Sequence, residues 1–159
     1  SFFAASALEK ARELASQQSR TTHASDIADE CCQFLADLLC RLGEGQQYDA
    51  AKQFSMNQEW SYPLHSILEA EYEDQHPHGI KSTGYVIDTL QSALWAVENS
   101  SSFEDAVLKA VNLGDDADTV GAVAGQIAGA MYGYTAIPNS LKSGLVSERK
   151  LYVTSQSLC

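Results

Sequence analysis

The sequence predicts an all-α fold, and three observations lead to that prediction. Apolar residues recur at helical spacing along most of the chain, for example in residues 27–42. No segment alternates between apolar and polar residues with the period of two expected of a half-buried strand. The composition, 45% hydrophobic and 19% charged, is that of a globular protein. A chain of 159 residues can bury one core, so we expect residues 1–159 to form a single all-helical domain.

Four helices are expected in the first part of the chain. Composition favours a helix over residues 6–18. After a polar link, Ser25 is a suitable N-cap for a second helix with an apolar stripe, and Gly43 is a suitable stop. A short third helix is expected over residues 48–54. The fourth, which follows a proline, is expected over residues 65–72.

The middle of the chain begins with an irregular loop over residues 74–79. Within this loop His76 and His78 flank a proline, with no second histidine pair or cysteine nearby, so we interpret them as solvent-exposed and not as metal ligands. A fifth helix follows. Its first residues include Ser82 and Thr83, either of which is suited to open it.

Three further helices complete the expected fold. Ser102 and Asp105 resemble a capping box, with Asp in place of Glu, for a helix over residues 103–111. The next helix begins near Ala117 and carries no charge after its first turn. A proline turn then leads to a last short helix over residues 140–146.

Charge and cysteine usage bound the environment of the protein. The net charge of −11 argues against nucleic acid and anionic membranes as direct partners, because both require a basic surface. No C-x-x-C pair occurs, and three of the four cysteines fall on one expected helix. The pattern predicts reduced, buried thiols and a cytoplasmic protein. The four cysteines are Cys31, Cys32, Cys40 and Cys159.

Two further features concern the chain as a whole. The uncharged run over residues 119–141 is long enough to span a membrane, but its many Gly and Ala residues give little transfer energy, so we expect a buried core helix. There is no signal-peptide pattern and no initiator Met. The first residues read as the interior of a helix, so we expect a fragment.

The most specific pattern is residues 112–133, NLGDDADTVGAVAGQIAGAMYG. Its carboxylates Asp115, Asp116 and Asp118, with the hydroxyl of Thr119, precede a helix. Neighbouring carboxylates repel one another and are relieved by a cation, and oxygen ligands of this kind suit Mg²⁺, Ca²⁺ or Mn²⁺. These groups cannot complete an octahedral site alone. Simple capping of the helix by the aspartates is the alternative interpretation.

A glycine stripe follows the acidic residues. Gly121, Gly125, Gly129 and Gly133 recur every four residues and share one helix face. Helical glycines cost roughly 0.5–1 kcal/mol each relative to Ala. Either a neighbouring helix or a ligand must therefore approach this face closely, and close helix packing in the core is the better explanation.

The acidic motif and its surroundings resemble the ADP-ribosylglycohydrolase family. Residues 112–133 look like the C-terminal signature of that family. The likeness extends to residues 82–90 and 93–96, to Thr22-His23 and to Ile137-Pro138. The resemblance implies an all-α, orthogonal helix bundle with a binuclear Mg²⁺ centre, in which Mn²⁺ is a possible substitute. It also implies hydrolysis of the glycosidic bond between ADP-ribose and a modified protein side chain or small molecule.

The resemblance also implies roles for individual residues. Asp116, Asp118 and Thr119 would be metal ligands, whereas Asp115 would be only a neighbour. His23 and Tyr85 would contact the ADP-ribose. The catalytic group is not identified by the resemblance. A metal-activated water would attack, and Asp116 is a possible catalytic residue.

The sequence departs from the family pattern in one respect. The Thr-Asp-Asp ligands of the family's N-terminal half do not occur in these 159 residues. We therefore expect this chain to supply half of the binuclear site, to need the N-terminal half, and to be inactive alone, and we expect the bundle to be incomplete at its N-terminus. The alternatives are a crystallin-like structural protein or an inactive ADP-ribose binder of the same fold.

Overall fold

The computed structural model describes residues 2–70, 72 and 77–157, apart from the side chains of residues 2–5 and 78. Within these ranges the chain forms nine α-helices and two 3₁₀-helices and no strand, which confirms the all-α prediction. The helices are α1 (Phe2–Ser19), α2 (Asp26–Gly43), α3 (Tyr48–Met56), α4 (Tyr62–Leu68), η1 (Pro77–Gly79), α5 (Val86–Glu98), α6 (Phe103–Val111), α7 (Ala117–Tyr132), η2 (Tyr134–Ala136), α8 (Asn139–Ser143) and α9 (Glu148–Gln156).

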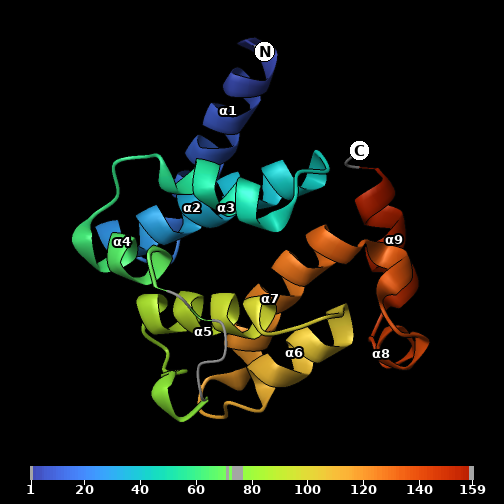
Figure 1. Ribbon diagram of the computed structural model, residues 1–159. Coiled ribbons are helices and arrows are strands. Elements are labelled where there is room, and N and C mark those ends of the chain that lie inside the picture. Colours follow the sequence, from blue (N-terminus) through green and yellow to red (C-terminus); the bar gives the residue numbers. More distant parts are fainter. Residues whose placement is uncertain (1, 71, 73–76, 158–159) are drawn as a thin grey trace.

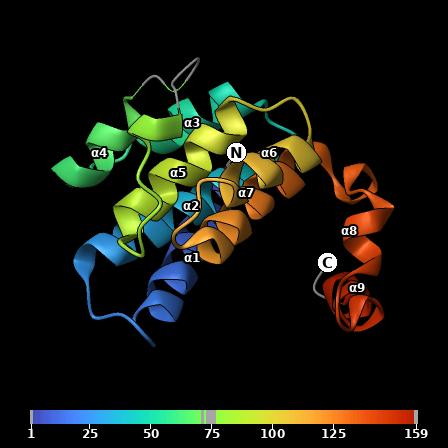
Figure 2. The same ribbon diagram turned by 90° about the horizontal axis from the view of Figure 1, so that it is seen from below.

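Helices α2, α5 and α7 form the centre of the fold. Helix α2 packs against α1, α3, α4, α5 and α7, while α7 also packs against α5 and α6. In Figure 1 the first helices lie above and α5, α6 and α7 below, and Figure 2 shows the three central helices nested between the others. Their inward faces carry fully buried side chains, which account for the apolar stripes in the sequence. These include Phe34, Leu38, Leu94, Val120 and Ile127.

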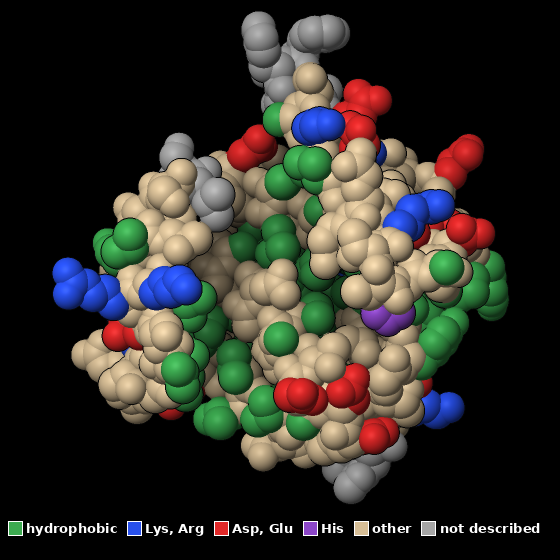
Figure 3. Space-filling view, turned by 180° about the vertical axis from the view of Figure 1, so that it is seen from behind, with side chains coloured by type: hydrophobic (Ala, Val, Ile, Leu, Met, Phe, Trp, Pro, Cys, Tyr) green, Lys and Arg blue, Asp and Glu red, His purple; other side chains and the backbone are tan. Residues whose placement is uncertain are grey.

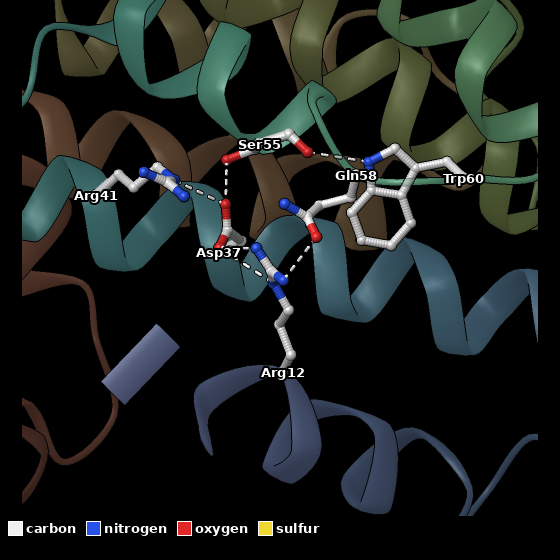
Figure 4. Close-up of polar contacts among 6 residues, drawn as sticks. All are labelled: Arg12, Asp37, Arg41, Ser55, Gln58 and Trp60. Carbon is white, nitrogen blue, oxygen red and sulfur yellow. Dashed lines mark hydrogen bonds and ion pairs between the residues drawn. The ribbon is translucent and has the colours of Figure 1, made fainter. Parts of the chain in front are cut away.

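A buried carboxylate joins α1, α2 and α3 (Figure 4). Asp37 has no solvent-exposed surface. It accepts hydrogen bonds from the Arg12 guanidinium, at 2.7 and 3.1 Å, from Arg41 Nε at 2.8 Å and from Ser55 Oγ at 2.6 Å. Burial alone would raise the pKa of Asp37, but these bonds favour the charged form and hold its pKa below the usual value. The network fixes α1 on α2.

The glycine stripe of α7 faces α6. A Cβ atom at Gly121 would lie 2.7 Å from Val111 Cγ1, and one at Gly125 would lie 3.8 Å from Val107 Cγ2. The stripe therefore serves close helix packing, as expected. Gly133 differs from the other glycines, because it ends α7 with a φ of 78°.

Several expected boundaries were right and others were wrong. Helix α6 occupies residues 103–111 as predicted, and Ser102 Oγ accepts the Asp105 N–H at 3.1 Å. Helix α4 spans Tyr62–Leu68 and not residues 65–72, because a proline is accommodated in its first turn. Helix α5 begins at Val86, after the segment that was expected to open it. Residues 73–76, including His76, and the His78 side chain lie outside the described part.

The C-terminal segment forms an arm that the sequence prediction placed only partly. The expected helix over residues 140–146 is shorter, at Asn139–Ser143, and α9 was not predicted. No residue of η2, α8 or α9 is buried, and Figures 1 and 2 both show α8 and α9 at the side of the body. Tyr134 holds the arm together, since its ring lies 5.4 Å from that of Tyr152 and beneath Lys142.

The cysteines and the uncharged run can be compared with their predictions. Cys31, Cys32 and Cys40 share α2 as free thiols, and of these Cys31 is buried. Burial raises the pKa of Cys31 to about 12, so this thiol stays protonated. Cys159 lies outside the described residues. Among the helices described, none combines the length and apolar character needed to cross a membrane.

Candidate functional site

The acidic motif forms a tight turn at the start of α7. Gly114 and Asp115 both have positive φ, 79° and 52°, so the backbone reverses just before Asp116. Asp116 occupies the N-cap position, but its side chain accepts no backbone N–H of the helix. Instead its Oδ1 accepts a hydrogen bond from the Thr119 hydroxyl at 2.9 Å. Simple capping therefore does not account for the Asp116 carboxylate.

Residues 81–85 hold this turn from the other side. The Asp116 N–H donates to the Ser82 carbonyl at 3.0 Å, and the Ser82 hydroxyl donates to the Gly114 carbonyl at 2.9 Å. Gly84 lies against the second carboxylate oxygen, because a Cβ atom at this glycine would be 3.6 Å from Asp116 Oδ2. Both flanks of the Asp116 side chain are thus defined, one by Thr119 and the other by Gly84.

A cavity of about 710 Å³ lies beside this turn. It is enclosed by the end of α1, the link that follows it, α2, the start of α5 and α7. His23, Tyr85 and Thr119 all line it. Apolar side chains form much of the remaining wall, among them Leu35, Leu39, Val86 and Val123. Figure 3 shows a hollow on the rear face of the molecule, with hydrophobic side chains inside it and a histidine and acidic side chains at its rim.

The predicted site residues are brought together only in part. Thr119, His23 and Tyr85 meet at the cavity, and Thr119 links it to Asp116. Asp118 lies in the first exposed turn of α7, and Asp115 is exposed. In the part of the chain that the structure describes, no three His, Cys, Asp or Glu side chains come together as a potential metal site. Carboxylate and hydroxyl oxygens, such as those of Asp116 and Thr119, are of the type that suits a hard cation.

His23 is exposed at the mouth of the cavity and is held by its neighbour. The Thr22 hydroxyl and His23 Nδ1 form a hydrogen bond of 2.8 Å. This contact leaves Nε2 directed away from the Thr22 hydroxyl, so one ring nitrogen remains for a ligand. Tyr85, the N-cap residue of α5, is 51% exposed although it lines a cavity, so its ring is accessible to a bound molecule.

The sequence analysis did not assign some of the residues around the site to it. Thr83 accepts the Tyr85 N–H, Gly84 lies against Asp116, and Asp88 accepts the Thr83 hydroxyl, but Thr83 was assigned only a capping role. The signal was Gly84 itself. A glycine is unfavourable inside a first helical turn, so it indicates that the helix starts later. The partner of Thr83, Asp88, carried no comparable signal.

Comparison with known proteins identifies the family to which this chain belongs. The sequence model of the family described as ADP-ribosylglycohydrolase matches residues 1–158. The chain therefore belongs to the ADP-ribosylglycohydrolase family. A solved structure titled "ADP-ribosylglycohydrolase-related protein complex" has the same fold, with a TM-score of 0.74 and 35% identity over 87% of this chain and 49% of that one.

Two individual proteins of known activity are similar to this chain in sequence. The chain is 39% identical, over 160 aligned residues, to the ADP-ribosylarginine hydrolase Tri1 of Serratia proteamaculans. This alignment covers 99% of this chain and 43% of the relative. It is 32% identical to the ADP-ribosyl-[dinitrogen reductase] glycohydrolase of Rhodospirillum rubrum, over 80% of this chain and 41% of the relative. The chain thus spans less than half the length of these relatives.

Proposed function

We propose that this chain takes part in hydrolysis of the glycosidic bond that links ADP-ribose to a modified protein side chain or small molecule. The observation that carries this proposal is the single cavity shared by His23, Tyr85 and Thr119, with Asp116 bonded to Thr119. A volume of about 710 Å³ lies within the range of roughly 300–1,000 Å³ typical of small-molecule sites. The names of the relatives favour an ADP-ribosylated protein as substrate.

Asp116, Asp118 and Thr119 would hold Mg²⁺, with Mn²⁺ as a substitute. The donor chemistry fits, because carboxylate and hydroxyl oxygens are hard ligands. Among the described residues, no donor is bonded to Asp116 Oδ2. This oxygen therefore remains available to a cation. Bound Mg²⁺ would lower the pKa of a water and polarise the ribose.

The chain's own residues would bind and orient the substrate. Tyr85 presents an exposed aromatic face, suited to stacking or apolar contact. His23 presents a ring nitrogen as a hydrogen-bond partner. The first N–H groups of α7 carry partial positive charge and suit a pyrophosphate. Apolar side chains of α2, among them Leu35 and Leu39, would contact the substrate on one side of the cavity.

We further propose that a second polypeptide segment, on this or another chain, completes the metal site. The incomplete ligand set and the greater length of the relatives support this proposal. So does the apolar surface of the C-terminal arm, where Val146 is 90% exposed. The isolated 159-residue chain is then expected to bind Mg²⁺ weakly and to be inactive. The free thiols of α2 are compatible with a reducing, cytoplasmic location.

Calorimetric titration of the full-length protein, with the segment that completes the metal site present, with MgCl₂ and then ADP-ribose tests the proposal. We expect Mg²⁺-dependent binding of ADP-ribose, weakened at least about tenfold by Asp118→Ala. Asp115→Asn is the matched control and should leave binding unchanged, because Asn tolerates the positive φ of 52° at this position as Asp does. No ADP-ribose binding by the protein with Mg²⁺ would favour the alternative of a structural protein of this fold. Hydrolysis of an ADP-ribosylated protein by the isolated chain would contradict the half-site proposal alone.

A further inference from the structure

The segment before α5 is held in an irregular conformation by hydroxyl groups. Thr89 Oγ1 donates to the Thr83 carbonyl at 3.1 Å, and Ser92 Oγ donates to the Lys81 carbonyl at 2.7 Å. Both donors are buried on α5. These bonds hold the backbone of residues 81–85 along the side of α5, so the segment does not continue α5 as a further helical turn.

The Thr83 side chain forms the central contact of this segment. Its hydroxyl donates to Asp88 Oδ2 at 2.6 Å and accepts the Tyr85 N–H at 3.1 Å. A hydroxyl has one proton, so donation to Asp88 turns an oxygen lone pair toward Tyr85. A hydrogen bond to a carboxylate is also stronger than one between neutral groups. Asp88 thus sets the orientation of the Thr83 hydroxyl and, through it, the backbone of Tyr85.

The same segment reaches the acidic turn. Ser82 accepts the Asp116 N–H and donates to the Gly114 carbonyl, while Gly84 contacts Asp116 Oδ2. One short segment therefore defines both the aromatic rim of the cavity and one flank of the Asp116 carboxylate. A change in its conformation would displace both together.

We propose that Asp88 and Thr83 are positioning residues that hold Tyr85 and Asp116 in the arrangement that binds ADP-ribose and the cation. This inference rests on the proposed function for the role of those two groups. Neither Asp88 nor Thr83 lines the cavity. Asp88 acts through the Thr83 hydroxyl, and Thr83 acts through the backbone of residues 82–85.

A purely structural role would be that of an ordinary helix cap, which stabilises α5 and nothing else. Ser102 provides the matched control for that role, because its hydroxyl caps α6 by accepting the Asp105 N–H at 3.1 Å, away from the cavity. Loss of either hydroxyl should lower thermal stability to a similar extent. Only loss of the Thr83 contacts should alter the site.

The test compares Asp88→Ala, Thr83→Val, Thr83→Ser and Ser102→Ala in the whole chain. Amide hydrogen exchange, followed by NMR, reports the hydrogen bonds of the Tyr85 and Asp116 N–H groups directly. Asp88→Ala leaves the Thr83 hydroxyl in place, so faster exchange at Tyr85 reports lost orientation and not a deleted partner. We expect exchange at both amides to accelerate about tenfold or more in Asp88→Ala and Thr83→Val.

The ligand measurement uses calorimetric titration of the full-length protein, with the segment that completes the metal site present, with ADP-ribose at saturating MgCl₂. We expect about tenfold weaker binding in Asp88→Ala and Thr83→Val, recovery to within about twofold in Thr83→Ser, and unchanged binding in Ser102→Ala. Unchanged exchange at Tyr85 in Asp88→Ala, or an equal loss of affinity in Ser102→Ala, would overturn the inference. If the unmodified protein binds no ADP-ribose, the proposed function fails, while the exchange rates still decide whether Asp88 positions the segment.

Discussion

Thr119 donates its hydroxyl to Asp116 Oδ1 across the first turn of α7, at 2.9 Å. The bond leaves Oδ2 of the same carboxylate beside Gly84. It also fixes the Asp116 side chain away from the helix N–H groups that it would otherwise cap. Thr119 is therefore a proposed metal ligand and also orients the carboxylate of Asp116, a second proposed ligand.

Replacing Thr119 by Val should weaken Mg²⁺ binding by roughly 10–100-fold, because both the hydroxyl ligand and the orientation of Asp116 are lost. Thr119→Ser should retain most of the affinity. Calorimetry with MgCl₂ measures both variants. Equal affinities for the Val and Ser variants would mean that the hydroxyl has no part in the site.

Close packing of α6 on α7 gives a second prediction. Gly121→Ala should lower the free energy of unfolding by about 1–3 kcal/mol, because its Cβ would lie 2.7 Å from Val111 Cγ1. Gly125→Ala is the matched control, since its Cβ would lie at an ordinary 3.8 Å from Val107. That variant should gain about 0.5–1 kcal/mol from helix propensity.

Urea denaturation of both glycine variants checks this contrast. Shortening Val111 to Ala in the Gly121→Ala background should restore most of the lost stability, since the clash is with a Val111 methyl group. Equal changes in the free energy of unfolding for the two glycine substitutions would show that Gly121 is not in close contact with Val111 of α6.

The buried Asp37 network should dominate the stability of the α1–α2 contact. Asp37→Asn removes the charge that balances Arg12 and Arg41 and should lower the free energy of unfolding by about 3 kcal/mol. Asp49→Asn, at an exposed position on α3, is the control and should change it by less than about 0.5 kcal/mol. Chemical denaturation measures both, and a neutral Asp37→Asn would contradict the assigned network.

The same carboxylate gives a pH dependence with a defined sign. The folded-state pKa of Asp37 is lower than the unfolded value of about 3.9. Its contribution to stability is therefore complete above that unfolded value and is lost as the pH falls through the folded pKa. We expect the Tm to drop steeply below about pH 4 in the unmodified protein. The drop should be shallower in Asp37→Asn, and parallel Tm profiles of the two proteins would exclude this assignment.

Helix boundaries were predicted accurately where the hydrogen bonds that set them join residues close together in the sequence. Helix α6 was placed to the residue because its cap, Ser102, bonds within its own turn. Ser82 and Thr83 have the same chemistry, but their hydroxyls bond to Gly114 and Asp88 instead, so α5 begins later than the cap residues suggested. Helix α9 buries no residue, and therefore had no apolar stripe facing a core to reveal it.

The candidate site was predictable to a different degree. The oxygen donors of the acidic motif could be found from residue type and spacing alone. The inclusion of His23 and Tyr85 depended on family resemblance, because they lie far from the motif in the sequence. The apolar wall supplied by α2 could not be foreseen, since its side chains read as ordinary core positions. Only the fold shows which of those positions face a cavity.

Gly84 provides the last prediction, because it borders Oδ2 of Asp116. A Cβ at this position would lie 3.6 Å from Asp116 Oδ2, an ordinary contact, and its backbone does not require a positive φ. Gly84→Ala should therefore fold with a Tm close to that of the unmodified protein. The added methyl group would cover Oδ2 and should weaken Mg²⁺ binding by about tenfold.

Gly43→Ala, where the added Cβ meets no atom within 4 Å, is the control. Calorimetry with MgCl₂ and thermal unfolding measure the two effects separately. Normal Mg²⁺ affinity in Gly84→Ala would mean that the cation does not approach Asp116 from this side.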